Sequence, residues 1–135
     1  MLNLVKILLR KQKKKKFKTF SEYWDINLSN KISKIGKADV IYSANTLSHI
    51  ENLENVFKAI NILLSENGVL IIEDPSLLKC LKNNAYDQFY CEHIYIFSTI
   101  ALNKILSKHG LILFDIENLN THGGSNRYYI KRKNS

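Results

Sequence analysis

The sequence is poor in the residues that break regular structure or cross-link a chain. Its 135 residues include one proline, five glycines and two cysteines. So little glycine and proline excludes a collagen-like chain and disfavours a disordered one. Cys80 and Cys91 lack CxxC spacing and further cysteine pairs, so neither a disulfide framework nor a metal site is expected. Two scattered cysteines fit a reducing compartment, and we expect a cytoplasmic protein.

Long hydrophobic runs are also absent. The apolar stretch at residues 2–9 is too short to span a bilayer. Its positive charges follow the apolar residues, which is the wrong order for a secretory signal. A basic amphipathic helix lying on a membrane remains an alternative, but we expect no membrane partner. The length suits a single domain.

Acidic residues are missing from residues 1–18, which hold Arg10 and seven lysines. Removing these eight charges from the 20 basic residues leaves 12, which equals the number of acidic residues, so the net charge of +8 belongs to one segment. Such a run is usually solvated. No zinc-finger or RNP-type pattern accompanies it, so we expect no nucleic-acid partner. We divide the domain into a basic amphipathic helix at 1–18 and an α/β portion at 19–132.

The apolar pattern of the first half predicts alternating helices and strands. A short strand is expected at residues 18–24 and a helix at 28–35, ended by Gly36. Residues 38–43 are a continuous β-branched run, typical of a strand buried on both faces of a parallel sheet. Asn52 is a credible N-cap for a helix at 53–64, with a stop at Asn67 and Gly68. A second apolar strand at 68–73 completes a right-handed βαβ unit.

The second half predicts two helices and two strands. A short helix at 76–82 precedes a longer one capped by Ser98 and ended by His109 and Gly110, where the helix dipole favours His109. Its inward face is predicted to hold Ile100, Ala101, Ile105 and Leu106. Strands follow at 111–116 and 126–132. The aromatic residues expected in the core are Tyr23, Trp24, Phe57 and Phe97.

Residues 86–98, YDQFYCEHIYIFS, concentrate chemically active side chains. Carboxylates, tyrosines, a histidine, an amide and a thiol occur together between two helices. Neither a core strand nor a solvent-facing helix needs this mixture. A second polar stretch, at residues 44–49, follows the first buried strand at its carboxyl end, where ligands bind in open parallel sheets.

The order of elements resembles the carboxyl half of the class I S-adenosylmethionine-dependent methyltransferases. Three motifs narrow the resemblance: ADVIYSANTLSHI at 38–50, IIEDP followed by YDQFYCEHIYIFS at 71–98, and HGGSNRYYI at 122–130. Together they are similar to the sugar C-methyltransferases, which act on nucleotide-linked 4-keto-deoxysugars. The resemblance implies a partial Rossmann-like α/β sheet equivalent to strands 3 to 7, in the family order 3-2-1-4-5-7-6. Nothing here matches the family's first two strands, its glycine-rich cofactor loop, its cysteine-rich zinc segment or its last domain.

The resemblance also implies a reaction and its residues. A base removes the proton beside the sugar ketone, and the enolate carbon attacks the methyl group of S-adenosylmethionine. Tyr90 and His93 match the base candidates, Glu92 the acid beside them, and His49 a second active-site histidine. Asn45 matches a position beside the cofactor, although Ala44 stands where the family often has another asparagine. The residues expected on the substrate side are Tyr86, Asp87, Gln88, His122, Gly123, Gly124, Ser125 and Arg127.

Several alternatives stay open at this point. His49 at a strand end could be structural, and Gly123 with Gly124 could form only a hairpin turn. The sequence does not decide between Tyr90 and His93 as base. The chain alone is expected to be weakly active or inactive and to bind the cofactor weakly. It could instead be a non-catalytic module or one half of a split enzyme, pairing its open strand edge with a chain that supplies the missing strands.

Overall fold

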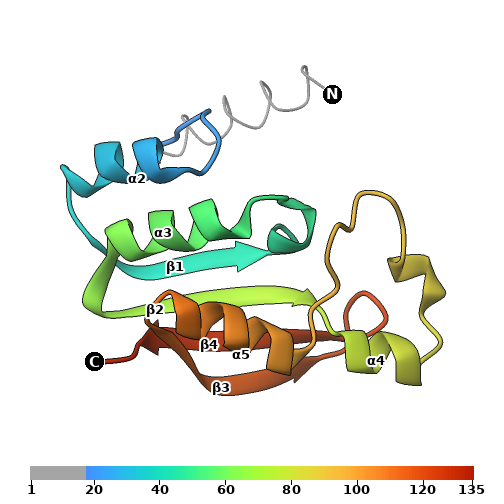
Figure 1. Cartoon of the computed structure of the whole chain (residues 1–135). Helices are drawn as coiled ribbons and strands as arrows, with labels where there is room; N and C mark the ends of the chain where they lie inside the picture. Colours follow the sequence, from blue (N-terminus) through green and yellow to red (C-terminus); the bar gives the residue numbers. More distant parts are fainter. Residues whose placement is uncertain (1–17) are drawn as a thin grey trace.

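The computed structural model describes residues 18–135 (Figure 1). The basic helix predicted over residues 1–18 therefore lies outside the described residues, except for Lys18. The helical elements are α2 (Ile26–Ser33), η1 (Leu47–His49), α3 (Leu53–Leu63), α4 (Leu77–Lys82), η2 (Tyr86–Gln88) and α5 (Thr99–Lys108). The strands are β1 (Ala38–Ala44), β2 (Leu64–Pro75), β3 (Leu111–Leu119) and β4 (Ser125–Arg132).

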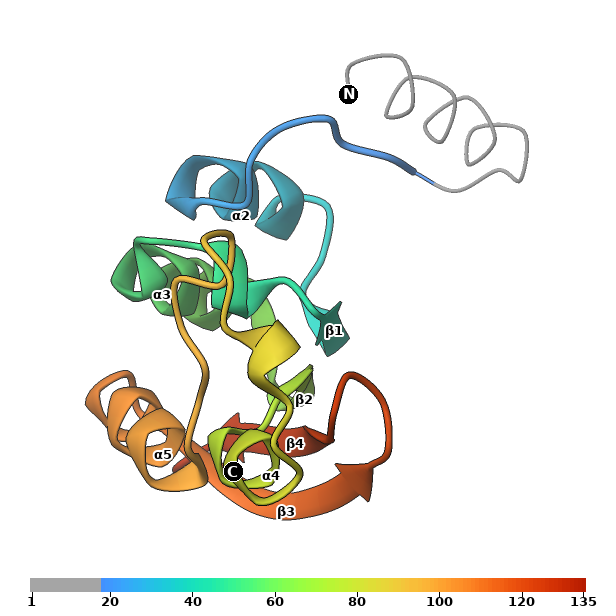
Figure 2. The same ribbon diagram turned by 90° about the vertical axis from the view of Figure 1, so that its right-hand side faces the viewer.

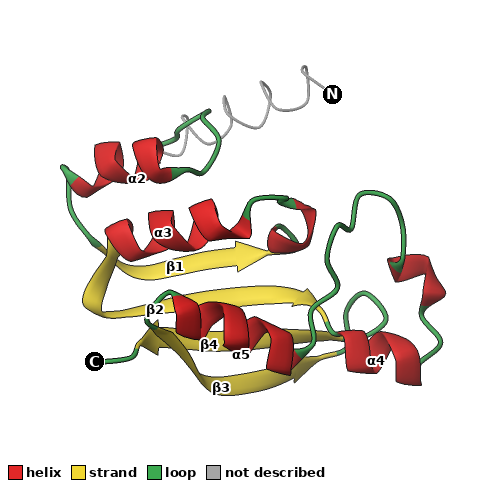
Figure 3. Ribbon diagram, viewed as in Figure 1, coloured by secondary structure: helices red, strands yellow, loops and turns green. Residues whose placement is uncertain are grey.

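The four strands form one mixed sheet in the order β1-β2-β4-β3 (Figure 3). β1 and β2 run parallel, whereas β4 is antiparallel to both of its neighbours, β2 and β3. This order agrees with strands 4-5-7-6 of the class I methyltransferase sheet. The predicted α/β class, the βαβ unit and the strands predicted at 38–43, 68–73, 111–116 and 126–132 are confirmed. The expected burial of the 38–43 strand on both faces is wrong, because Val40 and Tyr42 are 60% and 58% exposed on one face of β1.

Helices α3 and α5 lie on the same side of the sheet, and α2 packs against α3 (Figure 2). Alternate residues of β2 point to this side, where Leu70, Ile72 and Asp74 are fully buried. Tyr128 and Ile130 of β4 join them. Phe57 and Phe97 are in the core, as predicted, and Trp24 packs against it. The helix-covered face therefore holds the core, and Asp74 enters it at the carboxyl end of β2.

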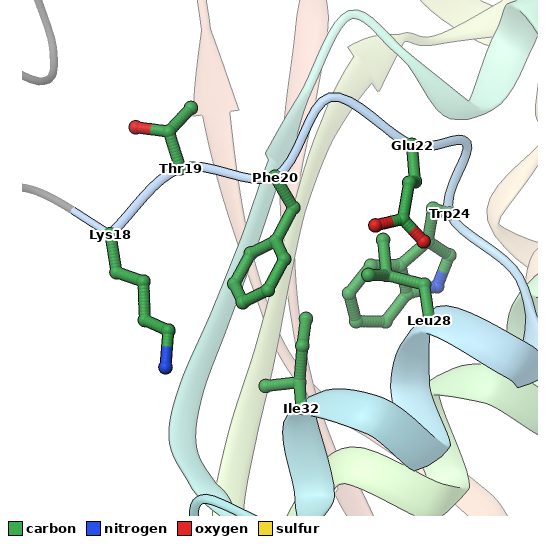
Figure 4. Close-up of a pocket in the computed structure, with 7 residues that line it drawn as sticks. All are labelled: Lys18, Thr19, Phe20, Glu22, Trp24, Leu28 and Ile32. Carbon is green, nitrogen blue, oxygen red and sulfur yellow. The ribbon is translucent and has the colours of Figure 1, made fainter.

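The predicted strand at 18–24 is wrong. In the described residues this segment forms no strand and runs past α2, where it lines a hollow of about 370 Å³ (Figure 4). The Phe20 ring lies in that hollow near Lys31, whose ammonium nitrogen is 5.8 Å from the ring centroid. In the family's strand order, the third strand pairs with the second. Residues 18–135 contain no such neighbour, so the segment has no ladder to join, and Tyr23 is 95% exposed rather than part of the core.

The start predicted for the helix at 53–64 is confirmed, and its predicted stop is not. Asn52 caps α3 as predicted, with its side chain accepting a bond from the Asn55 amide. The predicted stop at Asn67 and Gly68 is wrong, because α3 ends at Leu63 and both residues lie inside β2. A Cβ on Gly68 would meet the Ala38 carbonyl oxygen at 2.9 Å. Gly68 therefore permits close approach of β1 and β2 instead of ending a helix.

The predicted inward face of the last helix is partly wrong. Ser98 caps α5 and His109 lies at its C-cap, as expected. Leu102 and Leu106 are fully buried, with Ile105 packed beside them, but Ile100 is 72% exposed. Ala101 is exposed as well. The helix begins at Thr99, and the i, i+4 pair Leu102 and Leu106 defines the buried stripe.

The helices in residues 18–135 include none with the length and apolar character needed to cross a membrane.

Candidate active site

The candidate site lies where β1 and β2 end, at their carboxyl termini (Figure 1). Asn45 and η1 follow β1, and the segment between η2 and α5 crosses over them. Two backbone bonds hold that segment in place: Tyr95 donates to the Ser48 carbonyl at 3.1 Å, and Leu77 donates to the Phe97 carbonyl at 3.0 Å. The two polar stretches singled out from the sequence therefore lie against each other, at the sheet edge where open α/β folds bind ligands.

Tyr90 and His93 form a hydrogen-bonded pair. The Tyr90 hydroxyl lies 3.0 Å from Nε2 of His93, and Nδ1 of His93 lies 2.7 Å from the Gln88 carbonyl oxygen. A carbonyl can only accept, so Nδ1 carries the hydrogen in this bond. In the neutral imidazole, Nε2 then accepts from the phenol. The arrangement gives the Tyr90 proton a defined destination.

His49 joins this pair. Its Nδ1 lies 2.7 Å from the Glu92 carbonyl oxygen, which fixes the ring in the same way. The His49 and His93 ring centroids are 4.8 Å apart. Glu92 therefore contributes to this contact through its backbone carbonyl. Nε2 of His49 takes no part in this bond and can contact another group. The predicted base candidates and the second histidine are brought together.

Asn45 and His122 meet from distant parts of the chain. The Asn45 amide nitrogen lies 3.3 Å from Nε2 of His122. Both residues have positive φ, 48° and 51°, and Asn84 is the other non-glycine residue with this conformation in the described chain. Strained backbone of this kind gathers at functional sites. The contact joins the predicted cofactor side to the predicted substrate side.

The turn that carries His122 packs tightly on α4 and η2. A Cβ on Gly123 would lie 2.5 Å from the Ala85 Cβ, and one on Gly124 would lie 2.7 Å from the Lys79 Cβ. Asn83 donates to the Gly123 carbonyl at 2.8 Å, and the Ser125 hydroxyl donates to the Thr121 carbonyl at 3.1 Å. Both glycines have positive φ. Gly123 and Gly124 thus lie in the turn of the β3–β4 hairpin, as the alternative held, and they also permit this close packing.

The first residues of the segment at 86–98 are partly exposed and partly buried. Tyr86 is 69% exposed, whereas Gln88 is buried and donates to the Asp87 carboxylate at 2.8 Å. A cavity of about 450 Å³ opens beside Tyr90 and His93, lined also by Leu77, Phe89 and Ile94. This volume is within the range of small-molecule sites. Tyr90 and His93 therefore border a space where a substrate could sit.

Arg127 lies apart from these residues. Its neighbour Tyr128 is buried under the helices, so alternation puts Arg127 on the opposite face of the sheet. There it pairs with Glu73, and with Glu117 at 2.6 Å. Both acids, led by Glu73, raise the pKa of the Arg127 guanidinium. The structure therefore does not bring Arg127 to Tyr90 and His93.

Sequence reasoning overlooked Asp74 and Ser48. Asp74 is fully buried, and burial raises the pKa of its carboxyl group, although Ser48, His49 and His93 act in the opposite direction. The available signal was the alternation Leu70, Ile72, Asp74, which places an acid on the core face of a strand. No three metal-ligating side chains gather anywhere in residues 18–135.

The described residues fit one side of a cofactor site. A cavity of about 290 Å³ lies at the end of β1, lined mainly by apolar residues and by Ser43 and Thr46. Asn45 follows directly. The five glycines of the chain form no loop that could cradle a cofactor. Only Gly123 and Gly124 are adjacent, and they lie in the turn after β3. Asn45 and the end of β1 could hold one end of a nucleoside-type cofactor, and other residues would have to hold the rest.

Comparison with known proteins places the chain in a family. Residues 3–114 match the family model described as a methyltransferase domain. The C-methyltransferase NovU of Streptomyces niveus is 33% identical over 90 residues, 67% of this chain. The chain spans about a fifth of that relative, because the match covers 21% of its length.

Solved structures agree in fold. A SAM-dependent methyltransferase from Anabaena variabilis matches with a TM-score of 0.57 at 14% identity, over 81% of this chain and 55% of that one. Magnesium protoporphyrin IX methyltransferase from Synechocystis PCC 6803, solved with bound SAH, gives 0.53 at 19% identity, over 72% and 46%. The model match covers most of the chain, and its sheet order agrees, so this chain belongs to the methyltransferase domain family.

Proposed function

We propose that the chain carries the proton-abstracting half of a C-methyltransferase that acts on a nucleotide-linked 4-keto-deoxysugar. The observation that carries this proposal is the relay from Tyr90 through His93 to the Gln88 carbonyl. Methylation at oxygen or nitrogen needs no proton taken from carbon, whereas methylation beside a ketone does. The 33% identity to a C-methyltransferase supports the same reaction class, and we expect the substrate and the protein to meet in the cytoplasm.

The residues suggest how the proton moves. The carbon–hydrogen bond beside the ketone breaks as the Tyr90 oxygen takes the proton, and the Tyr90 hydrogen passes to Nε2 of His93. The electron pair left on the sugar becomes an enolate. His93 ends as an imidazolium whose Nδ1–H stays bonded to the Gln88 carbonyl. General-base catalysis of this kind typically accelerates a reaction by about 10²- to 10⁴-fold.

The remaining residues orient the reactants. His49 can direct Nε2 toward a sugar oxygen, since its Nδ1 is held by Glu92. Tyr86, Asp87, Gln88 and the turn at 122–125 surround the substrate in this proposal, with Asn45 beside the cofactor. S-adenosylmethionine, when bound, supplies the electrophilic methyl group that the enolate carbon takes.

The test isolates proton abstraction from methyl transfer. The chain is mixed in D₂O with a dTDP-linked 4-keto-6-deoxysugar, and NMR follows deuterium entering the carbon beside the ketone. We expect exchange above the buffer rate, reduced about 100-fold or more in Tyr90→Phe and His93→Gln. Tyr23→Phe is the matched control, because Tyr23 is 95% exposed and remote from these contacts. Exchange equal to buffer alone, or unaffected by either substitution, would contradict the proposal.

A second candidate is a non-catalytic module that pairs through β1 with a strand from another chain. β1 has a neighbour on one side only in the described sheet, and its Val40 and Tyr42 side chains are 60% and 58% exposed. Unpaired strand edges are templates for such pairing. Co-expression with a candidate chain carrying a glycine-rich strand and loop, followed by co-purification, tests it. A wild-type chain that exchanges the sugar proton unaided would overturn this second candidate.

A further inference from the structure

The cavity beside Tyr90 and His93 has a polar part and an apolar part. Tyr90, Cys91 and His93 supply the polar groups, and the other residues that line it are apolar: Leu77, Phe89, Ile94 and Ile96. Among residues 18–135, no Lys, Arg, Asp or Glu lines this cavity. Phe89 is 49% exposed and Ile94 is 43% exposed, so the apolar part is open to a ligand. Apolar walls with a few polar groups are typical of small-molecule sites.

The backbone fixes this apolar wall next to the proton relay. Phe89 directly precedes Tyr90, and Ile94 directly follows His93. The Phe89 amide donates to the Tyr86 carbonyl at 3.0 Å, and the His93 amide donates to the Tyr90 carbonyl at 2.9 Å. Two turns therefore hold Phe89 and Ile94 at the two ends of the Tyr90–His93 segment, and both residues line the cavity that the relay borders.

The chemistry of the wall favours a carbon that carries no hydroxyl group. A hydroxyl group placed against aliphatic and aromatic side chains loses its hydrogen bonds to water and gains no partner, which costs free energy. A methyl group in the same place is stabilised by leaving water. In a 4-keto-6-deoxysugar, a single ring carbon separates the ketone from the methyl group. The methyl group therefore enters the same cavity as the carbon that gives up its proton.

We infer that Phe89 and Ile94 are specificity-determining residues: they form a wall that accepts the methyl group of a 6-deoxysugar and disfavours a hydroxymethyl group. This inference rests on the proposed function for the class of sugar, but the preference for the deoxy carbon is a property of binding and needs no turnover. Apolar pockets discriminate against an added hydroxyl group by about 10²-fold. The diphosphate of the substrate lies outside this cavity, because no cation lines it among the described residues.

The test compares two ligands that differ by one oxygen atom. In dTDP-6-deoxyglucose a methyl group replaces the hydroxymethyl group of dTDP-glucose, and neither ligand has a ketone, so calorimetric titration of the full chain measures binding alone. We expect the wild-type chain to bind the deoxy compound about 100-fold more tightly. Ile94→Asn and Phe89→Asn each add an amide that can bond the hydroxyl group, so the preference should fall about 10-fold. Ile100→Asn is the matched control, since Ile100 is 72% exposed on α5, and it should keep the full preference.

Equal affinity of the wild-type chain for the two ligands, including no binding of either, would overturn the inference. A preference that neither wall variant changes would overturn it as well. A general loss of structure weakens the binding of both ligands alike and leaves their ratio intact, so the ratio reports the wall itself. The deuterium-exchange assay separates this inference from the proposed function. Selective binding without exchange counts against the proposed function alone, whereas exchange with equal affinities counts against the wall alone.

Discussion

The amide nitrogen of Asn45 lies 3.3 Å from Nε2 of His122, and both residues have positive φ. Seventy-seven positions apart, they join the end of β1 to the turn between β3 and β4. A pair of non-glycine residues held in the left-handed region stores strain on both sides of one contact. Substitutions at Asn45 can therefore separate the cost of the strained backbone from the contribution of the hydrogen bond.

Replacing Asn45 by glycine should leave the unfolding free energy of the protein almost unchanged. Glycine adopts φ of 48° without steric cost, so relief of strain offsets the loss of one exposed hydrogen bond. We expect a change in unfolding free energy within about 1 kcal/mol, measured by urea denaturation. Asn45→Ala is the control: it loses the amide and keeps the strain, so it should be the less stable of the two. Equal destabilisation in both variants would show that the left-handed backbone is not the governing term.

Gly123→Ala should destabilise the protein more than Gly110→Ala. Both positions have positive φ, 71° and 67°, so each substitution carries a conformational cost of about 1 kcal/mol. Only Gly123 adds a clash, since its Cβ would lie 2.5 Å from the Ala85 Cβ, whereas nothing lies within 4 Å at Gly110. Overpacking of this kind costs about 1–3 kcal/mol further. Thermal denaturation of the two variants measures the difference, and equal melting temperatures would mean that the turn does not pack on residue 85 in solution.

Arg127→Gln should lower the melting temperature modestly, and the loss should shrink in high salt. The substitution leaves Glu73, whose side chain is 15% exposed, without its cation. Added salt screens the exposed contact with Glu117 more than the contact with Glu73. A double-mutant cycle with Glu73→Gln measures the pairwise energy. If Arg127→Gln leaves stability intact but abolishes sugar binding, Arg127 serves the substrate, as the family resemblance implies, and not the sheet.

Asp74→Asn should stabilise the protein at pH 7. Burial raises the pKa of Asp74 above its ordinary 3.8, so the fold holds this proton after the unfolded chain has released it. Wild-type stability therefore falls as pH rises from the unfolded to the folded pKa, and asparagine escapes that loss. The gain should be about 1.4 kcal/mol for each unit by which the pKa is raised, and should vanish below pH 3.8.

Urea denaturation at a series of pH values checks the Asp74 prediction. Asp39→Asn is the control, because Asp39 is exposed and bonds only the Ser65 hydroxyl at 2.9 Å. A pH-independent gain would point to packing instead of charge.

Hydrophobic periodicity predicted most of this fold. The runs at 38–43 and 111–116 and the stripe on α3 specify elements by local pattern, and the carboxyl-end position of Asn45 and His49 follows from the βαβ rule. Residues 18–24 could not be predicted in this way, because a strand forms only where a neighbour accepts its hydrogen bonds. Ile100 was wrongly predicted to face the core, because two sets of apolar residues at helical spacing overlap at the start of α5. Packing buries the set that contains Leu102.

Less of the candidate site than of the fold could be predicted from the sequence. Motifs predicted the meeting of Tyr90 and His93, which their short separation allows. Asn45 with His122, and Asp74 with Asn126, depend on three-dimensional pairing between β2, β4 and the turn after β3. Arg127 shares a motif with the glycine turn, yet strand alternation sends it to the other face.

The single neighbour of β1 also leaves a spectroscopic signature. A strand directs alternate amides to opposite sides, so β2 can protect only about half of the β1 amides from hydrogen exchange. Within residues 38–44 we therefore expect slow and fast exchange to alternate along the strand. A strand that joins the outer edge would slow the fast set and leave the other set unchanged. This alternation makes β1 a built-in reporter, able to reveal a docking strand residue by residue before anything is known about where that strand comes from.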